Sequence, residues 1–275
     1  MKVSFFDKRI LHKFYGVLSV ISVLTSILFL FVEISQKCKV KIGFASLCIL
    51  ITIYVVLWLH ANLRRSISLK INTSEIEIKF GDIFEEQAEL KAIGFNEYFD
   101  TIVDDTIISK SSLHGQYIEK FYKGRTAELD RIISSNTHLA EARLGETPER
   151  IAGKKVRYKL GTIVVVNDYL LTALSRFDEN NKAYLEIDDY INCLLNFWNE
   201  IDRVYAGRTV ALPILGSGIT RFKGYENISD QELIELIIWT FKVSRIKFTY
   251  PSKVKIIVWD QKRNHINLLR LKQLE

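Results

Sequence analysis

Residues 15–32 read YGVLSVISVLTSILFLFV and residues 42–59 read IGFASLCILITIYVVLWL, and neither stretch contains a charged side chain. As a helix, each stretch would rise about 27 Å at roughly 1.5 Å per residue, close to the roughly 30 Å hydrocarbon core of a bilayer. A core helix of a soluble domain would show a polar face, whereas these stretches carry only scattered Ser and Thr. The first stretch is also longer than the apolar part of a signal peptide, and no cleavage site precedes the second. The sequence therefore predicts two transmembrane helices, at about 14–34 and 42–61, within an N-terminal region 1–66.

Basic residues are more numerous at the outer ends of this helix pair than in its connection. Seven lie at the outer ends and three in the connection: Lys2, Lys8, Arg9, Lys13, Arg64, Arg65 and Lys70 against Lys37, Lys39 and Lys41. Short segments rich in Lys and Arg tend to stay on the cytoplasmic side of a membrane. We therefore expect a multi-pass membrane protein with both termini in the cytoplasm.

The net charge of +6 belongs to the membrane region. Residues 1–66 contribute +7, which leaves −1 for the rest of the chain. The part of the chain after residue 66 therefore has no excess of positive charge, so we expect no nucleic-acid partner. The three cysteines, Cys38, Cys48 and Cys193, have neither the spacing of metal ligands nor the number needed for a disulfide framework. We accordingly expect no metal ion.

Residues 67–275 alternate apolar strands with helices. The pattern predicts two strands within 66–80 around a turn at 72–74, strands at 92–95, 161–166, 170–177, 209–215 and 254–259, and helices at 112–122, 187–205 and 229–243. Ser229 and Glu232 form the capping-box pair of the last helix. The charged region 125–157 is expected to be a surface region with partial helix. The predicted fold class is a transmembrane α-hairpin followed by an α/β domain, whose mixed, largely parallel sheet has helices on both faces.

Ligands of such sheets bind at the carboxyl ends of the strands, which singles out three loops, those after Phe80, Phe95 and Leu215. Gly216-Ser217-Gly218 follows a buried strand, where glycines let successive N–H groups approach a phosphate. Arg221 adds a positive charge close by. The alternative is a tight turn that binds nothing. No Asp–His pair lies near Ser217 in the sequence, so we do not expect it to act as a nucleophile.

The other loops offer polar groups of matching kinds. Asp82 could accept a hydrogen bond from an amine such as the adenine amino group, and Asn96 could donate to a ribose hydroxyl. Each of these two side chains could equally stabilise only its own turn. His114 and Gly115 open a helix, and helix N-termini favour anions.

Four segments resemble a macro domain in their order and spacing, over roughly residues 67–265: Gly81–Ile83, Asn96–Asp100, Leu113–Gly115 and Leu212–Ile219. The resemblance implies that Asp82 holds adenine, that Asn96 and Phe222 lie near the distal ribose, and that the loops 113–115 and 216–222 cradle the two phosphates of ADP-ribose. The implied ligand-binding set is Asp82, Ile83, Asn96, Leu113, His114, Gly115, Gly216, Ser217, Gly218, Ile219, Arg221 and Phe222.

The departures from the family pattern concern catalysis. Macro domains usually show an Asn-Ala-Ala-Asn loop followed by a run of glycines, whereas this chain has Gly94-Phe95-Asn96 and then Ser112-Leu113-His114-Gly115. In hydrolytic members the first loop positions the substrate and the attacking water. We therefore expect no catalytic residue, and no cofactor besides the ADP-ribose-derived ligand.

A two-span hairpin joined to such a domain resembles the membrane effector of a Thoeris-type bacterial anti-phage system. The resemblance implies a partner TIR-domain protein that cleaves NAD and makes an ADP-ribose-derived messenger, histidine-linked for the two-span type. Binding would then lead to disruption of the inner membrane.

Two spans cannot enclose a pore, so the chain is expected to self-associate in the bilayer. The candidate face carries small and hydroxyl residues at helical spacing and ends at an acid: Gly16, Ser19, Ser22, Ser26 and Glu33. The same hydroxyls could line a polar path, or simply bond carbonyls of their own helix. Two rival functions remain open, a membrane-tethered hydrolase of ADP-ribosylated substrates and a passive membrane-anchored nucleotide-binding scaffold.

Overall fold

The computed structural model describes residues 3–32, 35–178 and 180–275, and the chain divides into two compact units. The first unit contains the residues up to Arg65 together with Ile266–Gln273. The second unit contains Ser66–His265 together with Leu274 and Glu275.

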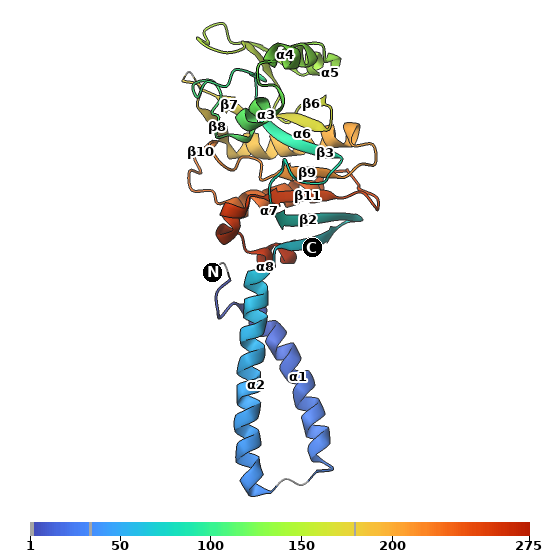
Figure 1. Ribbon diagram of the computed structural model, residues 1–275. Coiled ribbons are helices and arrows are strands. Elements are labelled where there is room, and N and C mark those ends of the chain that lie inside the picture. Colours follow the sequence, from blue (N-terminus) through green and yellow to red (C-terminus); the bar gives the residue numbers. More distant parts are fainter. Residues whose placement is uncertain (1–2, 33–34, 179) are drawn as a thin grey trace. The chain divides into compact units, whose positions relative to one another are not determined.

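The first unit is built on two long helices, α1 (Lys8–Phe29) and α2 (Gln36–Leu63), and it includes the short helix α8 (Leu268–Leu271) (Figure 1). Both long helices have the length and apolar composition needed to cross a membrane. They begin at Lys8 and Gln36, earlier than the predicted starts at 14 and 42, because hydropathy marks the apolar part of a helix and not its first turn. The start of α1 is set by Asp7, whose carboxylate accepts the N–H of Arg9 at 2.9 Å.

The long helices contact each other and the N-terminal segment near the start of α1 and the end of α2. Trp58 donates its indole N–H to the carbonyl of Val3 at 3.0 Å, and the Asn62 side chain accepts the Val3 N–H at 3.1 Å. An apolar cluster surrounds these bonds and takes in one residue of α8: Val3, Ile10, Tyr54, Ala61 and Leu269.

Most apolar side chains in the remainder of α1 and α2 are exposed. On the face predicted for self-association, the Ser19 hydroxyl donates to the Gly16 carbonyl at 2.8 Å, so this hydroxyl bonds its own helix. Glu33 and residue 34 of the first predicted span lie outside the described residues.

The second unit contains a nine-stranded mixed sheet in the order β1-β2-β11-β9-β3-β7-β8-β10, with β6 paired to β7. Its strands are β1 (Ser66–Ile71), β2 (Ser74–Phe80), β3 (Leu90–Asn96), β6 (Ile163–Val166), β7 (Tyr169–Phe177), β8 (Ala183–Glu186), β9 (Val210–Pro213), β10 (Arg221–Lys223) and β11 (Val254–Val258). The central strands β2, β11, β9, β3 and β7 are all parallel. The prediction of a mixed, largely parallel sheet is confirmed, although β8 and β10 were too short to be predicted.

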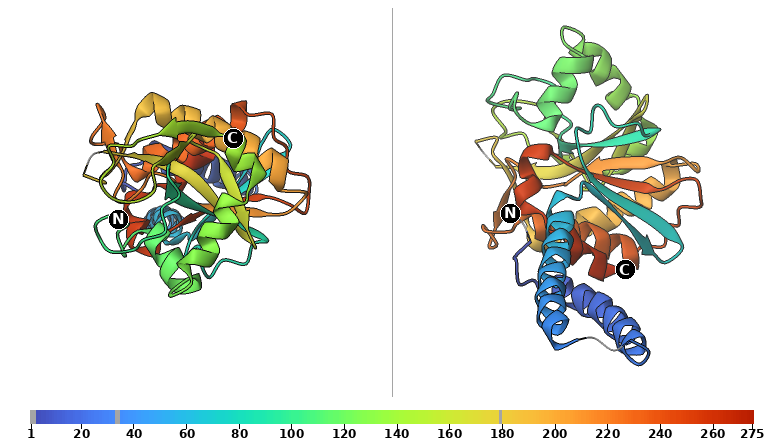
Figure 2. Two further views of the ribbon diagram at one scale, coloured as in Figure 1. Left: turned by 90° about the horizontal axis from the view of Figure 1, so that it is seen from above. Right: turned by 60° about the horizontal axis from the view of Figure 1, so that its bottom comes forward.

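Helices cover both faces of this sheet (Figure 2). One face carries α3 (Leu113–Phe121), α4 (Thr126–Ser134) and α5 (Thr137–Glu141), and the other carries α6 (Ile187–Val204) and α7 (Asp230–Val243). The helices α6 and α7 are joined by the buried Trp198 indole, which donates to the Thr240 hydroxyl at 3.1 Å. The predicted capping box at the start of α7 is present.

Residues 126–158 form the surface region with partial helix that the sequence predicts, since most of them are exposed or half-buried. They form α4, α5 and a two-stranded sheet of β4 (Arg143–Glu146) and β5 (Val156–Tyr158). Leu129, Ile133 and Leu139 of this region are buried in the same cluster as Phe95 of the central sheet. The helical spacing of these three buried apolar residues was not predicted, because charged residues lie between them in the sequence.

Gly161 permits the close packing of α6 against the sheet, and we expect Gly161→Ala to destabilise the second unit. Its backbone is left-handed, with φ +85°, and a Cβ there would overlap the Cys193 carbonyl and lie 2.8 Å from the Phe197 nitrogen. Strain and overlap together predict a loss of about 2–5 kcal/mol in the free energy of unfolding.

The matched control is Gly207→Ala, which shares a left-handed φ of +74° but would place its Cβ in open space. It should lose only about 1–2 kcal/mol, the conformational part alone. Urea unfolding of the detergent-solubilised chain measures both values, and equal losses would contradict the packing role of Gly161.

Candidate functional site

A cleft of about 860 Å³ lies at the carboxyl ends of the parallel strands β2, β11, β9, β3 and β7. This is the edge at which open α/β sheets bind ligands. The walls come from the loops that follow these strands, from the start of α3, and from the turn between β7 and β8. Neighbouring strands lie about 4.8 Å apart, so the cleft extends about 19 Å from β2 to β7 and suits an elongated ligand.

Asp82 lies at the β2 end of this cleft, directly after the strand. Its carboxylate is exposed, and Oδ1 accepts the N–H of Phe84 at 2.8 Å. Among the described residues Oδ2 has no partner. The buried Ile83 and the half-exposed Trp259 add apolar surface to the same end. This end can therefore hold a flat apolar ring and accept a hydrogen bond from an amino group on that ring.

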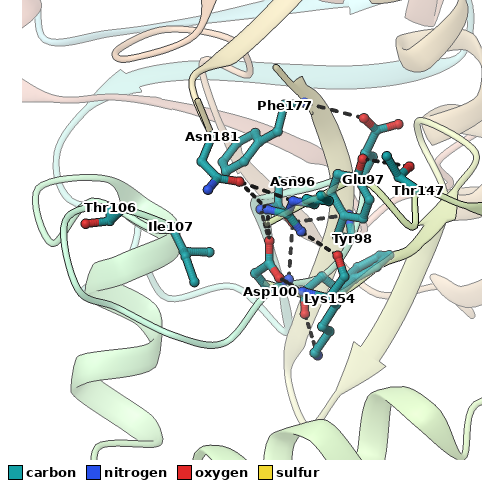
Figure 3. Close-up of polar contacts among 12 residues, drawn as sticks. Asn96, Glu97, Tyr98, Asp100, Thr106, Ile107, Thr147, Lys154, Phe177 and Asn181 are labelled. Carbon is teal, nitrogen blue, oxygen red and sulfur yellow. Dashed lines mark hydrogen bonds and ion pairs between the residues drawn. The ribbon is translucent and has the colours of Figure 1, made fainter. Parts of the chain in front are cut away.

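A buried ion pair supports the opposite wall of the cleft. Asp100 Oδ2 accepts Arg150 Nη2 at 2.7 Å and Asn96 Nδ2 at 2.8 Å, and Asp100 Oδ1 accepts the Lys154 N–H at 2.7 Å (Figure 3). The two charged side chains are only 1% and 4% exposed. Buried charges are tolerated when they are paired and hydrogen-bonded, and both conditions hold here.

Asn96 lines the cleft, but its amide is largely engaged by the protein. Its Oδ1 accepts the N–H groups of Tyr98 and Asp100, each at 3.2 Å, and its Nδ2 donates to Asp100. The side chain is 1% exposed. Its principal role in the structure is therefore to shape the loop after β3.

His114 is a neutral imidazole in the wall formed by α3. Its ring stacks on Phe95 with 3.6 Å between ring centroids, and Nε2 lies 2.9 Å from the Asp100 carbonyl oxygen. A carbonyl only accepts, so Nε2 carries the proton. Burial in this apolar setting lowers the pKa of His114 from 6.5 to about 3.

Gly115 brings the start of α3 against the preceding loop. A Cβ at this position would overlap the Ser109 carbonyl oxygen. The Gly115 N–H is bonded by the capping hydroxyl of Ser112 at 3.0 Å. Leu113 and His114 line the cleft in this first turn, where helix N–H groups lack intrahelical partners and favour an anion.

The loop after β9 reaches the cleft through two left-handed glycines. Gly216 has φ +83° and Gly218 has φ +123°. A Cβ on Gly216 would lie 3.0 Å from the ring of Phe222, which packs edge-on against Tyr190 behind the loop. Because these residues bear no Cβ, their backbone can approach a bound phosphate closely.

Ser217 is held between charges of opposite sign. Its hydroxyl donates to Asp230 Oδ1 and accepts from Lys262 Nζ, while Lys262 Nζ and Asp230 Oδ1 lie 3.0 Å apart. Asp230 was therefore a partner that the sequence did not reveal. Both partners hold the hydroxyl in place, so the arrangement is that of a clamp on the loop.

The structure places ten of the twelve sequence-predicted site residues on the lining of this one cleft: Asp82, Ile83, Asn96, Leu113, His114, Gly216, Ser217, Gly218, Ile219 and Arg221. Gly115 and Phe222 lie behind the lining and support it. The role of these residues in binding stays a prediction.

Other lining residues were missed by sequence reasoning, among them Ile107, Phe177, Asn181, Trp259 and Lys262. Trp259 directly follows β11, so the strand-end rule that singled out Asp82 could have found it. Asn181 lies in the turn between β7 and β8, and Lys262 lies in the 3-10 helix Asp260–His265. The approach of both residues to the cleft depends on distant partners, and their local sequence carries no signal of it.

Comparison with known proteins agrees with this architecture. The family model described as Thoeris protein ThsA, Macro domain, matches residues 76–259. The Thoeris protein ThsA of Bacillus amyloliquefaciens (strain Y2) is 39% identical over 248 residues, covering 89% of this chain and 82% of that protein. A glycine-to-valine mutant of the Oceanobacillus iheyensis macrodomain, solved with ADPR, has a similar fold, with a TM-score of 0.51 and 12% identity over 76% of this chain and 98% of its own.

The sheet order, the helices on both faces and the cleft at the strand ends define the second unit as a macro domain. The chain belongs to the family of the Thoeris protein ThsA, through a macro domain of the type found in that protein. The resemblance to a macro domain of a Thoeris-type protein, drawn from the sequence, is thereby confirmed.

His114 should make the stability of the fold depend on pH. Between pH 6.5 and about 3 the unfolded chain binds a proton at this imidazole and the folded chain does not, so stability falls as pH falls through this window. At pH 5 the loss relative to neutral pH is about 2 kcal/mol. Urea unfolding of the unaltered chain and of His114→Gln, which keeps a donor for the Asp100 carbonyl, measures it. The variant should lose less stability between pH 7 and 5, and identical losses would rule out a buried neutral His114.

Proposed function

We propose that this chain is a membrane effector of anti-phage defence whose macro domain binds an ADP-ribose-derived messenger. The observation that carries the proposal is the distribution of groups along the cleft. A carboxylate acceptor, Asp82, lies at one end, and phosphate-binding backbone at Gly216–Gly218 and at the start of α3 lies farther along. Membership of the ThsA family and the macrodomain neighbour solved with ADPR support the same ligand class.

The proposed ligand lies along the strand ends. Its adenine occupies the Asp82 end and donates its amino group to the free Oδ2, against the apolar surface of Ile83 and Trp259. Its diphosphate accepts N–H groups from the glycine loop and from the α3 start, which also contributes the positive end of a helix dipole. Its distal part points toward β7, where the protein would contact a histidine-linked or other substituent.

The protein is proposed to sense this ligand and not to turn it over. Ser217 is clamped between Asp230 and Lys262, and the Asn96 amide is committed to Asp100 and to its own loop. Neither arrangement contains the nucleophile–histidine pair of a hydrolase, since the Ser217 hydroxyl is hydrogen-bonded to a carboxylate and a lysine. A membrane-tethered hydrolase of ADP-ribosylated substrates is the rival, which product analysis separates from the sensor.

The helices α1 and α2 are proposed to span the bacterial inner membrane with both termini in the cytoplasm. Their 22 and 28 residues rise about 33 and 42 Å, enough for the roughly 30 Å hydrocarbon core.

A TIR-domain partner would supply the messenger by cleaving NAD. Because two spans cannot enclose a pore, disruption requires self-association, which the messenger promotes only if it binds the assembled state more tightly. In the rival scaffold function the spans only localise the domain.

Asp82→Asn should weaken binding of ADP-ribose by about 10- to 100-fold, the equivalent of a charged hydrogen bond of roughly 1.5–3 kcal/mol. Asparagine keeps an oxygen for the Phe84 N–H, so the turn is preserved. Calorimetric titration of the full chain in lipid nanodiscs measures the affinity, and the nucleotide is recovered afterwards to check for cleavage.

The control for this measurement is Asp202→Ala, which removes an exposed carboxylate of α6 outside the cleft lining and should leave the affinity unchanged. Recovery of intact ADP-ribose would support the sensor. Turnover would favour the hydrolase, and no binding by the unaltered chain would refute the nucleotide site.

Replacing Ser22 and Ser26 together by Leu should abolish protection against phage in cells that also express the TIR-domain partner. The added bulk would keep neighbouring helices apart at the proposed association face. The matched control replaces Val17 and Val20 by Leu, because both side chains are exposed and, at about 100° per residue, lie on the side of α1 away from Ser22 and Ser26. Affinity for ADP-ribose should stay the same in all variants, and full protection by the double serine variant would count against this face.

A further inference from the structure

Asn181 presents a polar side chain at the end of the cleft opposite Asp82. It lies in the turn between β7 and β8, with a left-handed φ of +56°, and it lines the cleft. The strands β2 and β7 are the outer two of the five parallel strands beneath the cleft. In the proposed binding orientation, Asn181 therefore faces the part of the ligand beyond the diphosphate.

Arg150 fixes which way the Asn181 amide points. Asn181 Oδ1 accepts Arg150 Nη2 at 2.7 Å and Arg150 Nε at 3.2 Å. A guanidinium has no acceptor, so the amide oxygen must face it and the NH₂ group must point the other way. Figure 3 shows this nitrogen directed away from the cluster around Asp100, and no partner for it occurs among the described residues.

The Arg150 side chain is itself immobilised on every side. Its remaining nitrogen donates to the Lys154 carbonyl at 2.6 Å, and Nη2 also pairs with Asp100. The guanidinium lies 3.9 Å from the centroid of the Tyr98 ring. A Cβ on Gly153 would lie 2.7 Å from Arg150 Nη1 and 2.8 Å from Asp100 Oδ1, so only glycine fits there. Arg150 does not line the cleft and can act on a ligand only through Asn181 and the loop of Asp100.

We propose that Asn181 determines specificity for the distal part of the ligand and that Arg150 is its positioning residue. The Asn181 Nδ2 group donates to an oxygen acceptor of the group attached beyond the diphosphate, which in ADP-ribose is the distal ribose or a substituent on it. The neighbouring Lys182, which also lines the cleft, adds a cation that favours an anionic substituent. This inference rests on the proposed function, because it takes the adenine end from Asp82.

The test compares ADP with ADP-ribose as probes, since ADP lacks the distal group. The variant is Asn181→Asp, which keeps an acceptor for Arg150 and tolerates a left-handed backbone, but presents an acceptor where the donor was. Affinity of the full chain in lipid nanodiscs for ADP-ribose should fall about tenfold or more, the equivalent of a lost hydrogen bond and a new repulsion. Affinity for ADP should stay the same.

Asn180→Asp is the matched control, because it adds the same charge in the same turn at an exposed cleft residue with no bond to Arg150. It should leave the preference for ADP-ribose over ADP nearly intact. Arg150→Lys should reproduce the selectivity loss of Asn181→Asp, and the double variant should lose no more selectivity than Asn181→Asp alone.

The possible outcomes distinguish the role of Asn181 from the proposed binding of a nucleotide. An equal loss for ADP and ADP-ribose, or an equal effect of Asn180→Asp, would overturn the assignment of Asn181 while leaving the nucleotide site intact. Failure of the unaltered chain to bind either nucleotide would overturn both. Selective loss of ADP-ribose binding in Asn181→Asp, with no such loss in Asn180→Asp, supports the role of Asn181.

Discussion

A carboxylate and a guanidinium, Asp100 and Arg150, are buried side by side at the back of the cleft, and the arrangement of the macro domain depends on them. Either charge alone would be costly in the interior, by several kcal/mol, so neither side chain can leave without exposing the other to that cost. Each also completes its hydrogen bonds with loop backbone, Asp100 with the Lys154 N–H and Arg150 with the Lys154 carbonyl. The pair therefore connects the loop after β3 to the segment between β4 and β5.

This connection explains how a cleft with loop-built walls keeps a defined shape. The loop after β3 is shaped from inside by Asn96, from α3 by the His114 ring, and from behind by the ion pair. The same guanidinium holds the turn between β7 and β8 through Asn181. Two walls of the cleft thus share one support that does not itself line the cleft. Such rigidity would lower the entropy lost when the proposed ligand binds.

The sequence predicted those features whose cause is local. Buried strands are continuous apolar runs, and the residue after a strand in a parallel sheet must lie at the ligand edge, which is why Asp82 and the glycine loop were found. The capping pair of Ser229 and Glu232 is likewise local. Arg150 was not recognised, since its partners Asp100 and Asn181 are 50 and 31 residues away and it lies among charged neighbours. Lys262 was not recognised for the same reason, because its contact with Ser217 spans 45 residues of sequence.

The composition of the first unit has a consequence for the order of events during synthesis. Ile266–Gln273 belong to the unit built on α1 and α2, although the whole of the cleft domain separates them in the sequence. Leu269 enters the cluster of Val3, Ile10 and Ala61, so this cluster cannot be completed until translation has passed residues 66–265. In the proposed membrane orientation, a nascent hairpin could enter the bilayer early, since N-terminal segments emerge first from the ribosome. Its final packing must wait, however, for a segment made only after the macro domain, so a translation product that stops within that domain would carry an unfinished hairpin.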